Sequence, residues 1–231
     1  MRLFQRAAHV LALVRQGHGA EAVRAARRRL HSRLLSYGLR RDLTVPFAAP
    51  PAKMELTVRP LAPQDDLSFL DIDPGLPSDV TVARLDQRRL VAAQLPTCWV
   101  AVGSDGKIVY MQWLIGPKDN HRIRAQWGSL FPRLGPDEAL LEGAYTVESA
   151  RGQGVMAHAM ARIAEAAAHM GTRWVITFVA DHNVASLKGC KKAGFSPYVE
   201  RRQSWLLFRR NVVFEPLPEG TPYAFELEAQ R

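Results

Sequence analysis

The feature that most constrains the fold is an alternation of short apolar runs and longer helical patterns across residues 139–195. Residues 139–147 and 174–180 are apolar runs of strand length, and the second is typical of a buried strand. An alanine-rich stretch at 157–170 and a shorter stretch at 183–193 follow them, and each ends before a glycine. Strands that alternate with helices in this way predict an α/β fold around one mixed sheet.

The flanking sequence predicts further strands and one more helix around this centre. Asp105-Gly106 lies between two β-rich runs, 98–102 and 107–115, which is the pattern of a hairpin. The stretch from Gly116 to Pro136 is mixed in character, and we expect it to form a long loop. The expected order is therefore β-α-β-β-β-α-β-α-β-β. The other predicted elements are a strand over Glu55–Leu61, a helix over Val80–Leu95, and strands over Tyr198–Phe208 and Asn211–Glu215.

Length and composition fit one globular domain with an appendage. The chain has 231 residues, of which 47% are hydrophobic and 23% are charged, so it can bury a sizeable core. Its apolar runs are shorter than the roughly 18 residues of a membrane-spanning helix, and we predict none. Cys98 and Cys190 are too few for a zinc ribbon or a disulfide framework, so we expect a cytoplasmic location and no metal.

The net charge of +9 is concentrated near the N-terminus. Residues 1–41 contain ten arginines and one acid, Glu21, whereas the remaining 190 residues contain 21 basic and 21 acidic side chains. The body of the chain is therefore electrically balanced, which argues against a nucleic-acid partner. We divide the chain into a basic helical segment at 1–41, a linker rich in proline and alanine at 42–54, and a globular domain at 55–231.

The basic segment has the pattern of two helices around a break at residues 17–19, and Gly38 marks the end of the second helix. Three roles stay open for it: a helical pair packed on the body, an amphipathic surface for anionic lipid or a protein partner at a membrane periphery, and a cleaved transit peptide. We expect a chain without residues 1–41 to keep its activity. The apolar stripe of the second helix comprises Val23, Ala26, Leu30, Leu34 and Tyr37.

The most informative segment runs from Glu142 to Met156, where a strand leads through a glycine-containing turn into a helix. The first turn of a helix has unpaired backbone N–H groups and a partial positive charge, so this turn can hold phosphate oxygens. Gly152 and Gly154 permit a close approach of the backbone, and Arg151 adds a cation. The spacing matches neither a P-loop nor the dinucleotide fingerprint, and taken alone the turn leaves a purely steric role open.

A second motif follows the next strand, where an Asn183-x-x-Ser186 helix ends at Gly194-Phe195. Together with the Arg151-x-x-Gly154 turn, this motif resembles the GNAT superfamily of acyl-CoA-dependent N-acyltransferases, and the resemblance extends over roughly residues 56–216. It implies a GNAT-like α/β fold with acetyl-CoA as co-substrate. The implied activity is an N-acetyltransferase that moves an acetyl group to the primary amine of a small molecule, such as an amino acid or an amino sugar.

The resemblance also implies where acetyl-CoA binds. Its pyrophosphate is expected on the backbone amides of the turn and the helix start, and its pantetheine alongside the strand. Asn183 and Ser186 are expected to meet the pantetheine arm, while Lys188 and Lys191 either reach the 3′-phosphate or lie in solvent. The residues of the turn are Arg151, Gly152, Gln153, Gly154, Val155 and Met156, and those of the strand are Ala144, Tyr145, Thr146 and Val147.

Direct attack of an amine on a thioester calls for a base, an oxyanion donor and an acid for the departing thiolate. Glu142 is the first candidate for the base, because burial within an apolar strand should raise the pKa of its carboxyl towards neutrality. A carboxylate in solvent or in an internal ion pair is the alternative. A backbone N–H of residues 144–147 is the expected oxyanion donor. Weaker candidates for the base are Glu148, Asp181 and His182.

The sequence departs from the family pattern at two positions. Met156 stands where the turn usually has a small residue, which narrows the space at the helix start. Cys190 stands where many relatives have the tyrosine that protonates the thiolate, so its thiol is a candidate acid and a buried structural role is the alternative. Tyr145 and Tyr198 are the other candidate acids, and the thiolate can also leave into water.

The acceptor is the part that the sequence determines least. Residues 116–136 form the expected specificity loop, in which Arg122 and Arg124 favour an anionic acceptor or simply lie in solvent; His121 and Trp127 belong to the same loop. Two alternatives to an acetyltransferase stay open. One is a non-catalytic acyl-CoA-binding module docked by its basic segment, and the other is an N-acyltransferase that uses a longer acyl donor.

Overall fold

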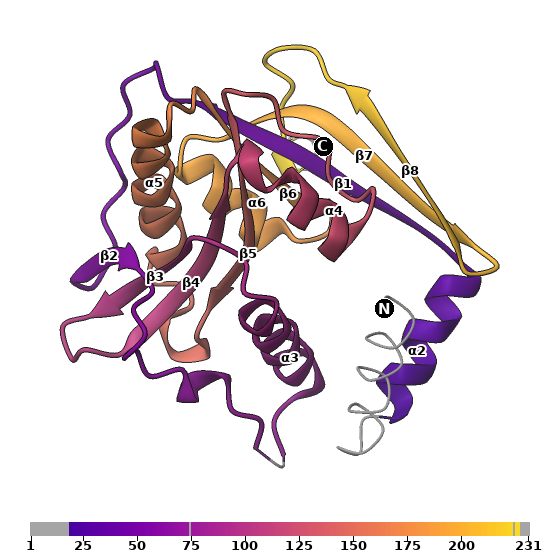
Figure 1. Ribbon diagram of the computed structural model, residues 1–231, viewed down its shortest axis with the longest axis horizontal. Helices are drawn as coiled ribbons and strands as arrows, with labels where there is room; N and C mark the ends of the chain where they lie inside the picture. Colours follow the sequence, from indigo (N-terminus) through magenta and orange to yellow (C-terminus); the bar gives the residue numbers. More distant parts are fainter. Residues whose placement is uncertain (1–18, 74, 224, 227–231) are drawn as a thin grey trace.

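The computed structural model describes residues 19–73, 75–223 and 225–226 (Figure 1). The first helix predicted in the basic segment lies outside these residues. In chain order the helices are α2 (Gly19–Leu30), α3 (Ser78–Ala92), α4 (Asn120–Trp127), α5 (Val155–Ala167) and α6 (Val184–Lys192). The strands are β1 (His31–Asp42), β2 (Leu56–Pro60), β3 (Cys98–Gly103), β4 (Ile108–Ile115), β5 (Glu138–Thr146), β6 (Trp174–Ala180), β7 (Ser196–Leu206) and β8 (Arg209–Pro216).

The strands form one mixed sheet in the order β2-β3-β4-β5-β6-β1-β7-β8. Strands β5 and β6 are parallel, and all other neighbours are antiparallel. Helices α5 and α6 cover one face, where Met160 and Leu187 lie in the core, and α3 and α4 cover the other with Leu90 and Ile123. Because both faces are covered, β4 is buried at every position. The predicted α/β class is thus confirmed.

From β2 to β8 the observed order of helices and strands is the predicted one, with one addition. Helix α4 lies in the stretch that we expected to be a loop, so that part of the prediction is wrong. The helix is held by Ile123, which is buried, and by Asn120, whose side chain bonds both the N–H and the C=O of Leu134 at 2.9 and 3.0 Å. Eight residues with one buried apolar side chain leave little periodic signal in the sequence.

The largest difference from the sequence-based expectation concerns residues 31–42. The second helix of the basic segment ends at Leu30, and the next twelve residues form β1. This strand lies between β6 and β7 and pairs with both in antiparallel register. The helical prediction is therefore wrong beyond Leu30. From Ser36 onwards every residue of this strand is buried or half-buried, so it lacks a clear two-residue alternation, and its apolar positions coincided with helical spacing.

Gly38 and two arginines show how β1 fits into the body. A Cβ at Gly38 would lie 2.3 Å from Cγ1 of Val199 and 2.8 Å from Cε1 of Phe178, so the glycine permits close packing and does not end a helix. Arg41 is 5% exposed, and its guanidinium donates to backbone carbonyls of α5 and of the turn after α6 at 3.2 and 3.5 Å. Arg40 stacks 4.3 Å from the ring centre of Trp174. These two arginines therefore belong to the globular unit.

Residues 43–55, which include most of the predicted linker at 42–54, contain no helix or strand. They nevertheless lie against the turn that precedes α5. The N–H of Lys53 donates to the carbonyl of Gln153 at 2.8 Å, and Nδ1 of His158 lies 2.9 Å from the carbonyl oxygen of Pro50. Strand β1 and this connecting segment thus both pack on the globular domain.

Candidate active site

Strands β5 and β6 separate after a short paired stretch, and this opening positions the site. Glu138, Ala139 and Leu140 pair with residues 174–176, and the two strands share no pairing beyond that point. A crevice beyond the carboxyl end of a parallel strand is a common ligand site in α/β sheets. A cavity of about 190 Å³ lies there. It brings together six of the predicted site residues: Glu142, Ala144, Met156, Asn183, Ser186 and Cys190.

A β-bulge in β5 shapes the wall of this cavity. Trp113 pairs with Glu142 and Met111 pairs with Tyr145, so Gln112 of β4 faces two residues of β5. One of the two is Gly143, whose φ is +70°. A Cβ there would lie 2.7 Å from Cδ1 of Leu90 and 2.9 Å from Cε3 of Trp113. Both the backbone conformation and the close packing therefore require glycine at this bulge.

Glu142 lines the cavity and is partly accessible from it. Burial raises the pKa of its carboxyl to about 7 and Asp86 adds to the rise, whereas the positive charge of Arg201 and the N–H of Gly143 act in the opposite direction. Both protonation states are then populated near neutral pH, which is the condition for proton transfer in either direction. The direction of this shift agrees with the expectation from the sequence.

Gln112 is a candidate that the sequence analysis missed. Its side chain is 1% exposed, lines the cavity, and accepts a hydrogen bond from the hydroxyl of Tyr110 at 2.7 Å through Oε1. Because the oxygen is engaged, the amide nitrogen is the group left to donate into the cavity. A buried amide is costly unless it is paired. The signal in the sequence was one glutamine within an otherwise apolar strand.

The turn before α5 has the geometry of an anion site. Gly152 and Gly154 have φ values of +74° and +80°, and no side chain caps the first turn of α5 in the described part of the chain. The first amides of the helix are therefore free to meet an anion. Arg151 lies beside them, and its guanidinium donates to the carbonyl of Thr146 at 3.2 Å.

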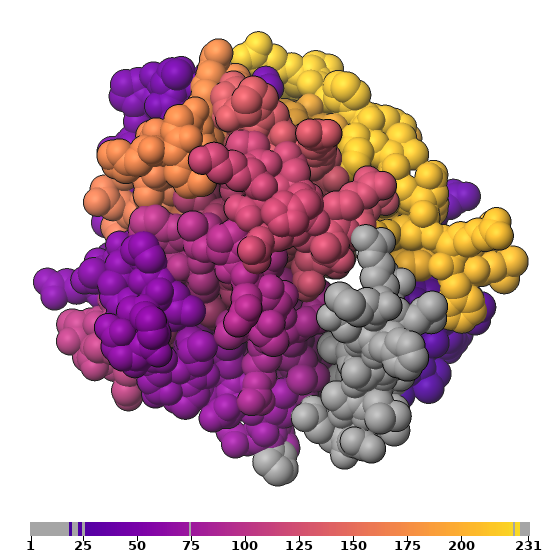
Figure 2. Space-filling view, viewed as in Figure 1, coloured from indigo at the N-terminus to yellow at the C-terminus, as the bar shows by residue number. Residues whose placement is uncertain are grey.

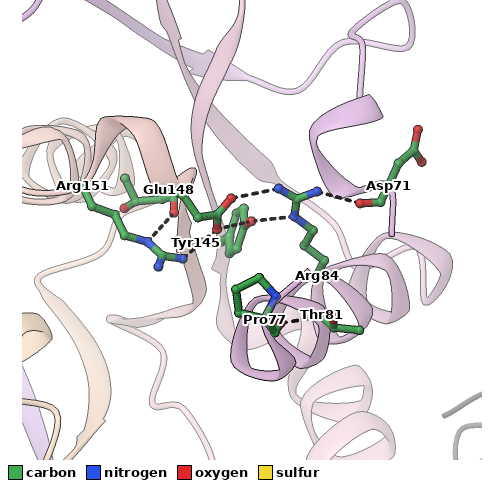
Figure 3. Close-up of polar contacts among 8 residues, drawn as sticks. Asp71, Pro77, Thr81, Arg84, Tyr145, Glu148 and Arg151 are labelled. Carbon is green, nitrogen blue, oxygen red and sulfur yellow. Dashed lines mark hydrogen bonds and ion pairs between the residues drawn. The ribbon is translucent and has the colours of Figure 1, made fainter. Parts of the chain in front are cut away.

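Figure 3 shows a polar network that joins this turn to α3. Glu148 accepts hydrogen bonds from Arg84 at 2.8 Å, from the hydroxyl of Tyr145 at 2.9 Å, and from Arg151 at 2.8 Å. Partial burial acts to raise the pKa of Glu148, but the hydrogen bonds from Arg84 and Tyr145 lower it overall. Glu148 and Tyr145 are thus engaged with each other and do not line the cavity, although both were candidates for proton transfer.

The remaining candidates for acid and base either lie outside the cavity or have a pKa unsuited to proton transfer near neutral pH. Cys190 is buried beside Met160, with 3.9 Å between the two sulfur atoms, and burial raises the pKa of its thiol to about 12. A thiol that holds its proton so firmly is a weak acid towards a thiolate with an ordinary pKa of about 8.5. His182 and Asp181 contact each other at 3.2 Å outside the cavity. Burial raises the pKa of Tyr198, which also lies outside the cavity.

Helix α6 places one pair of predicted residues at the cavity and turns two lysines away. Oδ1 of Asn183 accepts from the N–H of Ser186 at 3.2 Å and thereby caps the helix. Lys188 lies 5.5 Å from the ring centre of Phe225, and Lys191 forms an ion pair with Glu226. The two lysines therefore contact the end of the described chain, and their contact with a 3′-phosphate stays a prediction.

The positive charge that lowers the pKa of Glu142 belongs to Arg201 on β7, and not to the specificity loop predicted at residues 116–136. Arg201 donates to the carbonyl of Leu130 and to Oγ of Ser36, each at 3.1 Å. Arg122 instead bonds the carbonyl of Gln94 at 3.0 Å and pairs with Asp119 at 3.2 Å. Nothing in the sequence singled out Arg201, because it is one of three consecutive charged residues in β7.

The site thus combines parallel strands that separate, a helix start without a side-chain cap, and a buried carboxyl whose pKa is raised to about 7. The family described as "Acetyltransferase (GNAT) domain" matches residues 55–196, which is more than half of the chain. The chain belongs to this GNAT acetyltransferase family, whose members are in general acyl-CoA dependent.

Two solved structures resemble this chain at low sequence identity. The GCN5-related glucosamine N-acetyltransferase region of a fungal multi-domain GH3 β-N-acetylglucosaminidase has a TM-score of 0.53 at 14% identity, over 82% of this chain and 23% of that chain. A GNAT acetyltransferase from Colwellia psychrerythraea has a TM-score of 0.47 at 15% identity, over 81% of this chain and 57% of its own. This chain therefore spans less than two thirds of either protein. No curated protein sequence matches it.

The described residues lack two kinds of feature. They contain no group of three or more His, Cys, Asp or Glu side chains that could hold a metal ion. Among the helices of the described ranges, none combines the length and the apolar character that crossing a bilayer requires. Cys98 and Cys190 are both free thiols.

Proposed function

We propose that this protein transfers the acetyl group of acetyl-CoA to the primary amine of a small molecule by direct attack. The observation that carries the proposal is the cavity at the β5–β6 opening, whose lining includes a carboxyl with a pKa of about 7 and Met156 in the first turn of the uncapped helix α5. Membership of the GNAT family supports the acyl-transfer chemistry.

The residues around the cavity fit acetyl-CoA, which supplies a thioester carbonyl when bound. Arg151 and the first amides of α5 would hold the pyrophosphate, because the helix start is uncapped and the space beside Gly152 is open. The strand residues 144–147 would run beside pantetheine, and Asn183 and Ser186 line the same cavity. Of the residues expected to bind acyl-CoA, Ala144, Met156, Asn183 and Ser186 line the cavity, which supports this placement of the ligand.

Glu142 is the proposed base. At a pKa of about 7 its carboxylate is present in a large fraction at neutral pH, and it can accept the proton that the amine loses on attack. The nearby charge of Arg201 limits the rise in the pKa of Glu142, so the carboxylate is not lost at pH 7. The structure therefore offers one group in the cavity that is suited to this step.

Gln112 is the proposed side-chain donor to the oxygen on which negative charge develops. Tyr110 engages its Oε1, so the amide nitrogen is oriented before the ligand arrives. A preoriented donor stabilises the transition state without reorganisation, and loss of one such donor typically lowers kcat by about 10² to 10³. No side chain is assigned as acid for the thiolate, which we propose leaves into water.

The test is release of free CoA thiol with acetyl-CoA and a panel of primary amines, including amino acids and amino sugars. The proposal expects turnover with at least one amine and none when acetyl-CoA is omitted. Mass spectrometry of the protein as purified identifies any bound acyl-CoA and so tests the chain length of the donor. Tight binding of CoA without turnover on any amine would instead indicate a binding module, and a co-purified longer acyl-CoA would replace the acetyl donor.

A further inference from the structure

Two segments that are far apart in the sequence meet at one end of the molecule. The turn between β7 and β8 lies beside the C-terminal end of α2 (Figure 1). The N–H of Leu207 donates to the carbonyl of Leu30 at 2.9 Å, and the N–H of Phe208 donates to the carbonyl of Arg29 at 2.8 Å. These backbone bonds fix the turn to the helix, so the two segments form one surface.

This surface exposes large apolar side chains. Leu206, Leu207 and Phe208 are 62%, 70% and 58% exposed, and Leu30 is 43% exposed. We call these four residues the apolar tip. Single exposed apolar residues are ordinary on proteins, but a cluster of them with a polar rim marks an interaction site. In Figure 2 the β7–β8 turn projects from the molecule next to α2, so the tip is convex and is not a groove.

The backbone of the tip is unfavourable for the residues that occupy it. Leu206 pairs with Arg209, which leaves Leu207 and Phe208 as a two-residue hairpin turn with φ values of +45° and +63°. Such turns favour Asn-Gly, because bulky side chains are strained at positive φ. Strain of this kind persists where the residues have a function, and here it presents two large apolar side chains to the surroundings.

A set of arginines surrounds the apolar tip. These arginines, which are named at the end of this paragraph, form no ion pair with a carboxylate in the part of the chain that the structure describes. Along residues 22–37 and 201–214, the two stretches that meet here, the sequence contains no acid. The tip is therefore both apolar and strongly basic. The arginines are Arg27, Arg28 and Arg29 in the last turn of α2, Arg33 on β1, and Arg209 on β8.

We propose that the apolar tip docks this protein on an anionic lipid bilayer. Apolar side chains that project from a convex surface can enter the boundary between headgroups and acyl chains, while arginines around them meet anionic headgroups. A protein partner would more commonly require complementary area beyond four side chains. In Figure 1 the β7–β8 turn lies at the end of the molecule away from β5 and β6, so the inference does not depend on the proposed acetyl transfer.

The test is co-sedimentation of the full chain with vesicles of phosphatidylcholine alone or with 30% phosphatidylglycerol. Binding is expected for the anionic vesicles only. It should weaken as salt is raised from about 0.05 to about 0.5 M, because the Debye length then falls from about 14 to about 4 Å and the surface charges are screened. Absence of binding to anionic vesicles at low salt by the folded protein would overturn the proposal. Equal binding to neutral vesicles would also contradict it, since the arginines would then have no role.

The decisive variant is Leu207→Asn combined with Phe208→Gly, which installs the residues that the turn favours. It should lower the partition constant on anionic vesicles by about tenfold for each apolar side chain removed, while its Tm stays equal or rises. The matched control is Val45→Asn, which removes an apolar side chain that is 60% exposed elsewhere and should leave vesicle binding unchanged. Vesicle binding by the double variant equal to that of the wild type would refute the role of the tip.

The arginines are tested by Arg28→Gln combined with Arg209→Gln, against the control Arg88→Gln combined with Arg162→Gln. The first pair should weaken binding to anionic vesicles about fivefold per charge, since one arginine at an anionic surface contributes on the order of 1 kcal/mol. The control pair removes the same charge from other helices and should have a smaller effect. Dimerisation through the tip, or binding to duplex DNA, without vesicle binding would overturn the proposal.

Discussion

Replacement of Glu142 by glutamine should lower activity and raise stability at the same time. In the native protein the pKa of the carboxyl is raised from 4.5 to about 7, chiefly by burial. Each pKa unit corresponds to 1.36 kcal/mol, so the ionised carboxylate destabilises the native state by about 3 kcal/mol at most above pH 7. Two effects reduce this value: the cavity admits solvent, and the substitution removes the negative charge next to Arg201. We therefore expect the free energy of unfolding of Glu142→Gln to exceed that of the wild type by about 1 to 2 kcal/mol at pH 8.

The pH dependence separates this effect from general repacking. Below pH 4.5 the carboxyl is protonated in both states and the gain should vanish; the penalty then grows between pH 4.5 and 7 as the unfolded chain releases its proton first. Urea unfolding of both proteins at pH 5, 6, 7 and 8 measures the difference. For the wild type, kcat should rise with pH and level off above an apparent pKa of about 7.

The activity of the variant tests the role of Glu142 directly. Removal of a general base typically costs about 10² to 10⁴ in rate, so kcat of Glu142→Gln should fall by at least about 10² while CoA binding is unchanged. Calorimetry with CoA supplies that control. A decrease of less than about tenfold in kcat, or a gain in stability that is the same at pH 5 and pH 8, would refute the assignment of Glu142 as a buried base.

Three further predictions concern Gln112 and Gly143 at the cavity and strand β1 in the sheet. Gln112→Met should lower kcat by about 10² to 10³ with unchanged affinity for CoA, and the carbonyl stretch of bound ¹³C-labelled acetyl-CoA should shift back towards its free value; an unchanged infrared band would remove Gln112 from the mechanism. Gly143→Ala should lower the free energy of unfolding by about 2 to 4 kcal/mol in urea titrations, because its Cβ meets Leu90 and its φ is positive; wild-type stability would contradict the bulge geometry. Deletion of residues 1–42 should abolish the cooperative thermal transition seen by circular dichroism, since β6 and β7 lose the strand between them. A folded and active deletion variant would support the original division at residue 41.

Part of the candidate site could be predicted because its residues lie close together in the sequence. The turn at Arg151–Gly154 and the Asn183-x-x-Ser186 helix lie within one β-α-β-α stretch, so their spacing already indicated the family. Glu142 could be predicted as well, because a carboxylate in an apolar strand is expected to have a raised pKa. Gln112 and Arg201 could not be, because they lie on β4 and β7 and reach Glu142 or its cavity only through sheet pairing and packing.

The sequence alone determined the order of elements from β2 to β8, the GNAT resemblance and the location of most charge, since each is written in local periodicity or spacing. The place of residues 31–42 was decided by tertiary structure alone. As an isolated segment they match a basic helix, but the gap between β6 and β7 offers a backbone partner on both edges and burial from Ser36 onwards. Those long-range contacts outweigh the weak local preference, and they turn the end of a presumed appendage into a central strand.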